Sequence, residues 1–214
     1  MGEATKILPI ALLIAGRRCV VVGGGPIATR KVRDLLDAGA HVHIVSPKIT
    51  DQLHAWVQND GRVSWRCGTF EPGDLAQARL VITATANRAV DAHVFDEGER
   101  LGLFVNSADD PERCNFYLMG LVRRDPVVVA VSTGGTSPAL AAYLKRRLDG
   151  DLEAELGKLA ELLGEVRHEF IGRGVSTESL PWSSVVTDEL VDLATRGLWD
   201  DVRTSVVSAL GVES

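Results

Sequence analysis

The sequence predicts an α/β protein with a Rossmann-type, doubly wound parallel sheet, followed by a small β/α segment and a helical carboxyl-terminal domain. Three observations predict it. Short apolar runs alternate with helical patterns through the first half of the chain, a glycine-rich turn follows the first of these runs, and the last third carries helical spacing only. The expected parts are residues 1–112, 113–149 and 150–214.

The first part is expected to alternate strands and helices. Residues 19–22 form a continuous run rich in valine, which is typical of a parallel strand that is covered on both faces. The apolar residues that follow recur at helical spacing, and Gly39 ends that helix; they are Ala28, Val32, Leu35 and Leu36. Further strands are expected at 42–45, 63–66, 79–85 and 103–106, with helices at 49–59 and 88–100.

The pattern changes after residue 112. Two apolar runs, 115–122 and 127–132, are joined by four residues only, so they can pair antiparallel but cannot form a parallel crossover. A helix is expected from Pro138 to about Leu148. The leucine-rich stripe from 152 to 170 predicts one long helix, and two amphipathic stretches follow at about 184–196 and 199–210. Apolar surface on such elements needs a cover, so we expect 113–149 to be a dimerisation segment and the protein to be a homodimer.

Composition excludes several classes of protein. A net charge of −6 argues against a general nucleic-acid binder and requires any polyanionic substrate to meet a local basic pocket. The apolar stretch 7–15 is interrupted by Pro9 and is too short to span a bilayer, so no membrane partner is expected.

The cysteines, at 19, 67 and 114, form no CxxC pair, which favours reduced thiols and the cytoplasm. His41 and His43 alternate on one strand face, where packing is favoured over ligation, and no permanent metal is expected.

The turn Gly23-x-Gly25-x-x-Ala28 directly follows a strand and opens a helix, which is the context of a dinucleotide-binding fingerprint. In such a turn the first glycine allows the tight bend, the second lets the backbone approach a pyrophosphate, and the small third residue allows close packing. Pro26 and Ile27 begin the helix whose positive end would face the phosphates. A purely structural glycine turn is the alternative.

The end of the second strand does not settle which nucleotide binds. NAD-preferring sites usually place an acid there to bond the ribose hydroxyls, but this sequence reads Ser46, Pro47, Lys48. Ser46 could bond a ribose hydroxyl, whereas Lys48 could meet the 2′-phosphate of NADP or simply be solvated. The sequence alone therefore leaves NAD and NADP open.

Several segments together resemble the precorrin-2 dehydrogenase and sirohydrochlorin ferrochelatase family, which includes the amino-terminal module of siroheme synthases. They occur in the family's order along nearly the whole chain: Leu8–Ile10, Cys19–Ala28, Arg30–Lys31, Ala84–Thr85, Phe104–Asn106 with Asp109, and Val129–Pro138. The resemblance implies the stand-alone form without a methyltransferase module, NAD-dependent oxidation of precorrin-2 to sirohydrochlorin, and a tetrapyrrole substrate. Some members also insert Fe2+, a transient partner, and the sequence leaves open whether this chain does.

The resemblance assigns the catalytic role to Asp109, which lies just past the carboxyl end of the fifth strand, where ligands of such sheets bind. A carboxylate beside the nicotinamide can accept the proton that leaves with the hydride. A turn cap is the alternative role, and Asp110 is the neighbour that could be confused with it. Ala84, Thr85 and Asn106 end the fourth and fifth strands, where they are expected to line the cofactor.

Substrate contacts are expected in the polar loop that begins the helix at Pro138. Its backbone N–H groups and hydroxyls could receive a substrate carboxylate, or could simply cap the helix; the loop residues are Ser132, Thr133, Gly134, Gly135, Thr136 and Ser137. The family often has serine where Thr133 stands, which leaves that position's role open. Basic residues that could meet carboxylates cluster nearby, and Arg113 is the one we favour.

Two other classes of function compete with the dehydrogenase. One is a Rossmann nucleotide-sensing regulatory module without catalysis, as in potassium-channel regulators, which needs neither Asp109 nor the polar loop. The other is a chelatase with a vestigial nucleotide site.

Overall fold

The computed structural model describes residues 6–211 of the chain, which form two compact units, 6–118 and 119–211. Each unit is described by itself below. The division into three parts that the sequence suggested stays a prediction.

The first unit is built on a five-stranded parallel sheet with the order β3-β2-β1-β4-β5, which confirms the predicted doubly wound fold. The strands are β1 (Arg18–Val22), β2 (His41–Val45), β3 (Val63–Arg66), β4 (Leu80–Thr83) and β5 (Phe104–Ser107). Strand order reverses between β1 and β4. In open α/β sheets that reversal marks the crevice where ligands bind, at the carboxyl ends of the strands.

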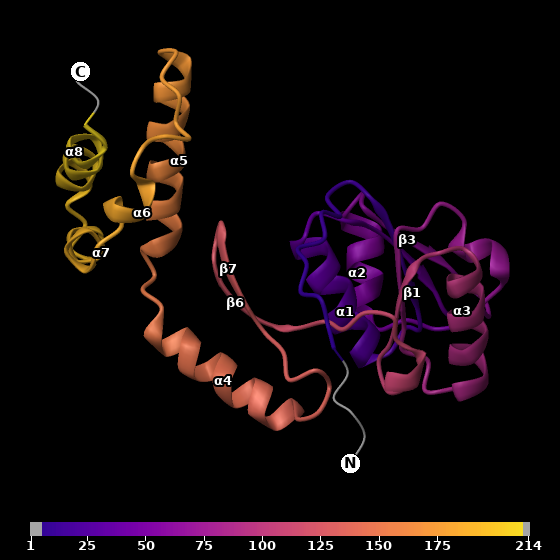
Figure 1. Ribbon diagram of the computed structural model, residues 1–214. Coiled ribbons are helices and arrows are strands. Elements are labelled where there is room, and N and C mark those ends of the chain that lie inside the picture. The colour runs from indigo at the N-terminus through magenta and orange to yellow at the C-terminus, as the bar shows by residue number, and fades with distance from the viewer. Residues whose placement is uncertain (1–5, 212–214) are drawn as a thin grey trace. The chain divides into compact units, whose positions relative to one another are not determined.

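Helices cover both faces of this sheet, as Figure 1 shows. On one face lie α1 (Pro26–Asp37) and α2 (Asp51–Asn59), and on the other lies α3 (Arg88–Arg100). Alternate residues of each strand point to opposite faces, so β1 sends Cys19 and Val21 into the core under α1 and α2 while Val20 and Val22 pack beneath α3. Because helices cover both faces, β1 is apolar at every position from Cys19 to Val22.

The observed bounds agree with the predicted ones to within a few residues. The helix expected from Ile49 begins at Asp51, because the hydroxyl of Thr50 accepts the backbone N–H of Leu53 and caps it. The strand expected over 79–85 is confined to Leu80–Thr83. Two short 3-10 helices were not predicted: η1 (Pro72–Leu75) and η2 (Pro111–Arg113).

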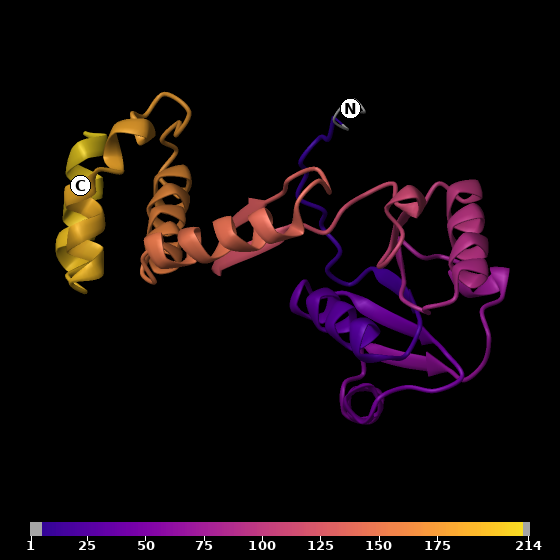
Figure 2. The same cartoon turned by 90° about the horizontal axis from the view of Figure 1, so that it is seen from below.

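The second unit begins with an antiparallel hairpin of β6 (Gly120–Arg124) and β7 (Val127–Val131), followed by α4 (Pro138–Asp151). The antiparallel pairing was predicted, but the first strand lies later than the apolar run at 115–122. Both arginines of the expected link belong to β6, and the turn consists of Asp125 and Pro126. Helix α4 packs beside β6 (Figure 2).

The remaining helices are α5 (Leu156–Gly172), α6 (Trp182–Val185), α7 (Asp188–Thr195) and α8 (Trp199–Leu210). They enclose a core of their own, centred on Leu159, Val166 and Phe170 of α5. The single helix expected from 152 is a wrong prediction at its start: Leu152 has an extended backbone and ends α4, and α5 begins four residues later. The stretch at 184–196 is divided into α6 and α7. None of the helices within residues 6–211 is long and apolar enough to cross a lipid bilayer.

Candidate active site

The glycine turn after β1 is held in place by the two strands that flank it. The backbone N–H of Gly23 donates to the carbonyl of Val45, and a Cβ at Gly23 would lie 2.3 Å from the carbonyl oxygen of Ala84. Gly24 is equally enclosed, since a Cβ there would lie 2.0 Å from the carbonyl oxygen of Lys48. Both glycines are therefore required by the fold itself. Sequence reasoning assigned no role to Gly24, because it occupies a variable position of the fingerprint.

Gly25 differs from its neighbours. A Cβ added to it meets no atom within 4 Å, and its φ of −83° is open to any residue. Neither packing nor backbone strain explains a glycine here. It is the second glycine of the fingerprint, whose function is to let a pyrophosphate approach the backbone. No side chain caps α1 at this residue and its first turn holds no acid, so its N–H groups suit an anion. The residues of this turn thus fit a dinucleotide.

The other residues at the start of α1 also suit a dinucleotide-binding turn. Pro26 occupies the first helical position, where no N–H is needed, and Ala28 is fully buried against the sheet. The hydroxyl of Thr29 donates to the carbonyl of Gly25 and lies 2.8 Å from the hydroxyl of Thr50, which ties the turn to the start of α2. These contacts fix the position of the turn without a ligand.

At the end of β2, Ser46 is nearly buried and its hydroxyl donates to the carbonyl of Lys48 at 2.7 Å. The hydroxyl proton of Ser46 therefore stabilises the loop that encloses Gly24. The Ser46 oxygen can still accept a hydrogen bond from a ribose hydroxyl. Pro47 and Lys48 are exposed, and no hydrogen bond or ion pair engages the Lys48 ammonium within the described residues. The role of Ser46 and Pro47 toward a ribose stays a prediction.

The carboxyl end of β4 carries a small polar network that sequence reasoning missed. Asp91, buried in the first turn of α3, accepts hydrogen bonds from the hydroxyls of Thr83 and Thr85. The Thr85 proton is thus engaged in holding α3 against the strand. Ala86, the next residue, adopts a positive φ of 56°, which is uncommon for a residue with a side chain and turns the chain sharply into α3. Ala84 and Thr85 lie at the predicted edge, but their contact with a cofactor is untested.

Beyond β5, the chain forms a tight loop from Ala108 to Arg113 whose base is closed by Cys114. The thiol of Cys114 accepts the backbone N–H of Ser107 at 3.2 Å and lies 3.4 Å from the carbonyl of Asp110. Burial raises the pKa of this thiol, so it stays protonated and can donate. Asn106 assists, because its amide nitrogen donates to the carbonyl of Phe116 at 3.0 Å. The amide of Asn106 therefore has a structural role, and its predicted contact with a cofactor stays a prediction.

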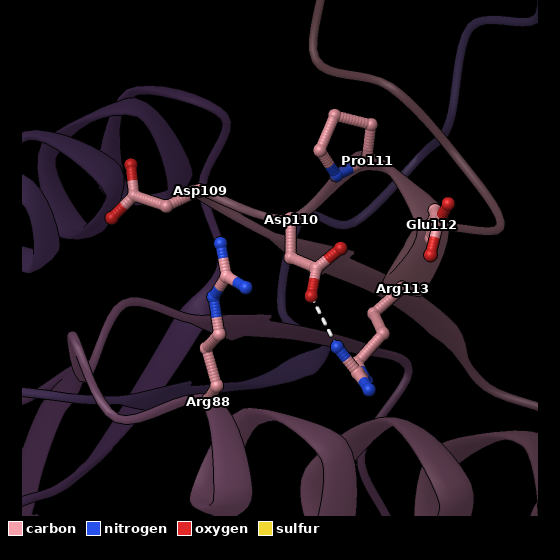
Figure 3. A pocket seen from close by; sticks show the side chains of 6 residues that line it. All are labelled: Arg88, Asp109, Asp110, Pro111, Glu112 and Arg113. Atoms are coloured by element: carbon pink, nitrogen blue, oxygen red, sulfur yellow. Dashed lines mark hydrogen bonds and ion pairs between the residues drawn. The ribbon is translucent and has the colours of Figure 1, made fainter.

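A cavity of about 650 Å³ opens beside this loop (Figure 3). Its lining residues come from the start of α3 and from the loop after β5: Arg88, Asp109, Asp110, Pro111, Glu112 and Arg113. The structure thus brings the predicted residues Asp109 and Arg113 together. It adds Arg88, which sequence reasoning missed.

The two neighbouring aspartates of this cavity are not equivalent. Asp110 is turned toward Arg113 and forms an ion pair with it, whereas Asp109 points away from that pair (Figure 3). Asp109 is exposed, and no hydrogen bond or ion pair involves its carboxylate in the part of the chain that the structure describes. Arg113 therefore already has an internal partner in Asp110, and its predicted contact with a substrate stays a prediction. Asp109 and Glu112 are the two carboxylates of the cavity that form no hydrogen bond or ion pair within the described residues, and Asp109, the one nearer the end of β5, is the one that the sequence singled out.

The polar loop of the second unit is bonded to itself. The hydroxyl of Thr133 accepts the N–H of Ser137 and donates to its carbonyl, and the hydroxyl of Thr136 donates to the carbonyl of Thr133. Ser132 accepts from Gly134, and Ser137 caps α4 by accepting from Leu140. Capping is therefore present. Contact with a substrate stays a prediction for all six residues.

Comparison with known proteins agrees with this geometry. A family model described as "Putative NAD(P)-binding" matches residues 10–119, and one described as "Sirohaem biosynthesis protein central" matches residues 124–150. The siroheme synthase of Nitrosospira multiformis is 43% identical over 165 residues, which are 76% of this chain and 35% of that protein. The siroheme synthase of Nitrosococcus oceani is 34% identical over 207 residues, or 96% of this chain and 44% of that protein.

The chain belongs to the family described as "Putative NAD(P)-binding", and it is similar to siroheme synthases over the aligned residues. It spans 35% to 44% of the length of these two curated relatives. A solved structure described as "SirC, precorrin-2 dehydrogenase" superposes with a TM-score of 0.66 at 26% identity and covers 95% of both chains. These matches confirm the resemblance expected from the sequence, the fold class and the nucleotide cofactor.

Proposed function

We propose that this protein oxidises precorrin-2 to sirohydrochlorin, with NAD+ as the hydride acceptor and Asp109 as the proton acceptor. The observation that carries the proposal is the uncommitted carboxylate of Asp109 past the end of β5, beside an Asp110 that Arg113 neutralises. The solved structure named as a precorrin-2 dehydrogenase, which matches over 95% of both chains, supports the choice of substrate.

Residues along the carboxyl-terminal edge of the sheet have different roles. The turn from Gly23 to Ala28 binds the pyrophosphate. The ends of β4 and β5 border the nicotinamide, since β4 lies next to β1 in the sheet and β5 lies next to β4. NAD+, when bound, supplies the acceptor for a hydride, that is, one hydrogen with its electron pair. Asp109 accepts the second hydrogen as a proton and, being exposed, returns it to solvent. Two hydrogens leave the substrate, and NADH and one proton result.

The test compares two neighbouring carboxylates. Precorrin-2 and NAD+ are mixed with each variant, and NADH formation and the sirohydrochlorin spectrum are followed. Asp109→Asn should bind NADH as the unchanged chain does but lose turnover by about 100-fold or more, the usual contribution of a general base. Asp110→Asn keeps an oxygen for Arg113 and should remain active. Near-normal turnover by Asp109→Asn would refute the proton-acceptor role.

The alternative hypothesis, a regulatory module that only senses a nucleotide, is less favoured. Such a module has no use for a carboxylate left free at the mouth of a cavity, and the matched relatives are named as enzymes. Tight NADH binding without turnover of precorrin-2 by the unchanged chain would support the module.

Iron insertion is a second candidate activity of the same site. The carboxylate that accepts a proton during oxidation can also accept a pyrrole N–H proton as Fe2+ enters the macrocycle. Fe2+ is a substrate of this reaction, and no cluster of three or more His, Cys, Asp or Glu side chains able to hold a metal occurs within residues 6–211. Asp109→Asn should then lose Fe2+ or Co2+ insertion into sirohydrochlorin together with oxidation. Insertion that proceeds without any NAD+ would show that the chelatase is independent of the nucleotide site.

We also propose that two chains form a homodimer through α4. None of the α4 side chains is buried, and three of the exposed ones are large and apolar. The relative exposure of Leu140, Tyr143 and Leu144 lies between 37% and 48%. Beside the hairpin, Val131 and Leu144 line a cavity of about 440 Å³. A second copy would cover this apolar face. Leu144→Asp should yield monomers in sedimentation while the exposed Lys145→Asp should not, and equal dimer masses would refute the assignment.

The cytoplasm is the compartment we propose. All three cysteines are free thiols and Cys67 is exposed, which suits a reducing environment. Fractionation of the cells that make the protein should recover it with cytoplasmic markers, and recovery from another compartment would contradict the assignment.

A further inference from the structure

The charges of the cavity beside β5 do not balance within the cavity. Three acids and two arginines line it, and the only ion pair among them joins Asp110 to Arg113. Arg88 is exposed and makes no hydrogen bond or ion pair with any residue that the structure describes. Its guanidinium is directed into the space between Asp109 and Asp110 (Figure 3). Arg88 is therefore a cation held at the cavity without an internal counterion.

The position of Arg88 is also unfavourable for the fold. It is the first residue of α3, a helix of 13 residues, where the helix dipole presents its positive end. Acids are favoured there and cations are not. The helix is already capped without it, because the side-chain oxygen of Asn87 accepts the N–H groups of Ala89 and Val90. A side chain that folding disfavours, aimed into the cavity of the reactive carboxylate, indicates a role toward a ligand.

We propose that Arg88 binds a peripheral carboxylate of the tetrapyrrole and so holds the edge of the macrocycle beside Asp109. This inference rests on the proposed function. A planar guanidinium can take a carboxylate through two parallel hydrogen bonds, which fixes both position and orientation. The need is physical, since a chain with a net charge of −6 repels a substrate that carries several carboxylates unless a local cation receives it. Arg113 already forms an ion pair with Asp110, so Arg88 is the arginine of this cavity that has no partner among the described residues.

The experiment measures binding separately from turnover, with the full chain. Sirohydrochlorin and NADH are titrated, each by its own spectrum, into the unchanged chain and into Arg88→Ala, Arg88→Lys and Arg79→Ala. Arg79 is the matched control, an exposed arginine that precedes β4 at the amino-terminal edge of the sheet. Arg88→Ala should weaken sirohydrochlorin binding by about 10- to 100-fold, the loss of a charged hydrogen-bonded contact, and leave NADH binding unchanged. Arg88→Lys should recover part of the loss, and Arg79→Ala should match the unchanged chain.

Two further readouts separate a ligand contact from a structural one. Removal of a cation from the start of α3 should leave the melting temperature of the unliganded chain equal or slightly higher, whereas loss of a structural contact would lower it. In turnover, Arg88→Ala should raise KM for precorrin-2 far more than it lowers kcat.

The outcomes distinguish this inference from the proposed function. If the unchanged chain binds sirohydrochlorin but does not oxidise precorrin-2, the proposed oxidation fails, and weaker sirohydrochlorin binding by Arg88→Ala still supports the anchor. Sirohydrochlorin binding by Arg88→Ala that equals that of Arg79→Ala would overturn it. So would a parallel loss of NADH binding, or an unchanged chain that binds no sirohydrochlorin.

Discussion

Replacement of Gly25 with alanine separates the needs of the fold from the needs of the cofactor. The new methyl group meets no atom of the protein within 4 Å, and the backbone at φ −83° accepts alanine without strain. The folded state therefore loses nothing, while the unfolded chain loses conformational freedom. Such a substitution stabilises a protein by about 0.4–1 kcal/mol. For a chain of this size that raises the melting temperature by roughly 1–4 °C.

The effect on the cofactor should have the opposite sign. A methyl group at the second glycine of the fingerprint occupies the space into which a pyrophosphate must come. Loss of one or two charge-assisted hydrogen bonds, at about 1.5–3 kcal/mol each, weakens NADH binding by roughly 10-fold to more than 100-fold. Thermal unfolding with and without NADH, together with NADH fluorescence titration, measures both effects on one sample.

Two other glycines serve as controls for Gly25→Ala. Gly61 also has no atom within 4 Å of an added Cβ, and it lies outside the turn, so Gly61→Ala should stabilise the chain and leave NADH binding intact. Gly24→Ala should lower the melting temperature outright, because its Cβ would lie 2.0 Å from the carbonyl oxygen of Lys48. If Gly25→Ala bound NADH as tightly as Gly61→Ala, the turn would not hold the pyrophosphate where we place it.

Three further predictions concern other parts of the chain. Burial alone would raise the pKa of Asp74, but hydrogen bonds from Arg66 and from a backbone N–H lower it below its ordinary value. Its stabilising effect is therefore complete above an unfolded pKa of about 3.9 and is lost as the pH falls through the folded value. Asp74→Asn should cost up to about 3 kcal/mol in urea unfolding at neutral pH, and the difference between the two proteins should shrink as the pH falls below the ordinary pKa of an aspartate; a constant difference would contradict this. Lys48→Glu should weaken NADPH binding more than NADH binding, since a 2′-phosphate would meet an acid after β2; equal changes in both titrations would place the 2′ position elsewhere. Gly157→Ala should destabilise the second unit by about 1–3 kcal/mol, because a Cβ would lie 2.3 Å from the carbonyl oxygen of Asp125, whereas Gly164→Ala in the same helix, with no atom nearby, should stabilise it; urea unfolding that ranks them the other way would refute the packing.

Most of the fold could be predicted because the central strands β1 and β4 are short, nearly continuous apolar runs. A parallel strand covered on both faces needs apolar residues at every position, as in Cys19–Val22, and few other structures produce that pattern. The break between α4 and α5 could not be predicted in the same way. Leu152 keeps the helical spacing of the leucines that follow, so periodicity cannot reveal that the backbone becomes extended there.

The site could be predicted only to the level of residue type and strand edge. Asp109 and Asp110 are adjacent and chemically identical, and their difference arises from the 3-10 turn at Pro111–Arg113, which brings Arg113 to Asp110. Gly24 is enclosed by a residue that is 24 positions away, so its constraint is a tertiary one. Arg88 had a local signal, a cation at a helix start that normally favours acids, but only the cavity gave that signal a meaning.

The residues that we assign to ligands are those for which the fold supplies no reason. Gly25 needs no glycine for packing, Asp109 has no internal partner, and Arg88 opposes a helix dipole. Gly24 and Asp110 lie beside them but are fixed by contacts with the protein. Because proteins tolerate locally unfavourable residues mainly at functional sites, the two groups should respond to substitution in opposite ways. Changes in the first group should leave the melting temperature equal or higher and weaken ligand binding or turnover. A change at Gly24 should instead lower the melting temperature of the unliganded chain.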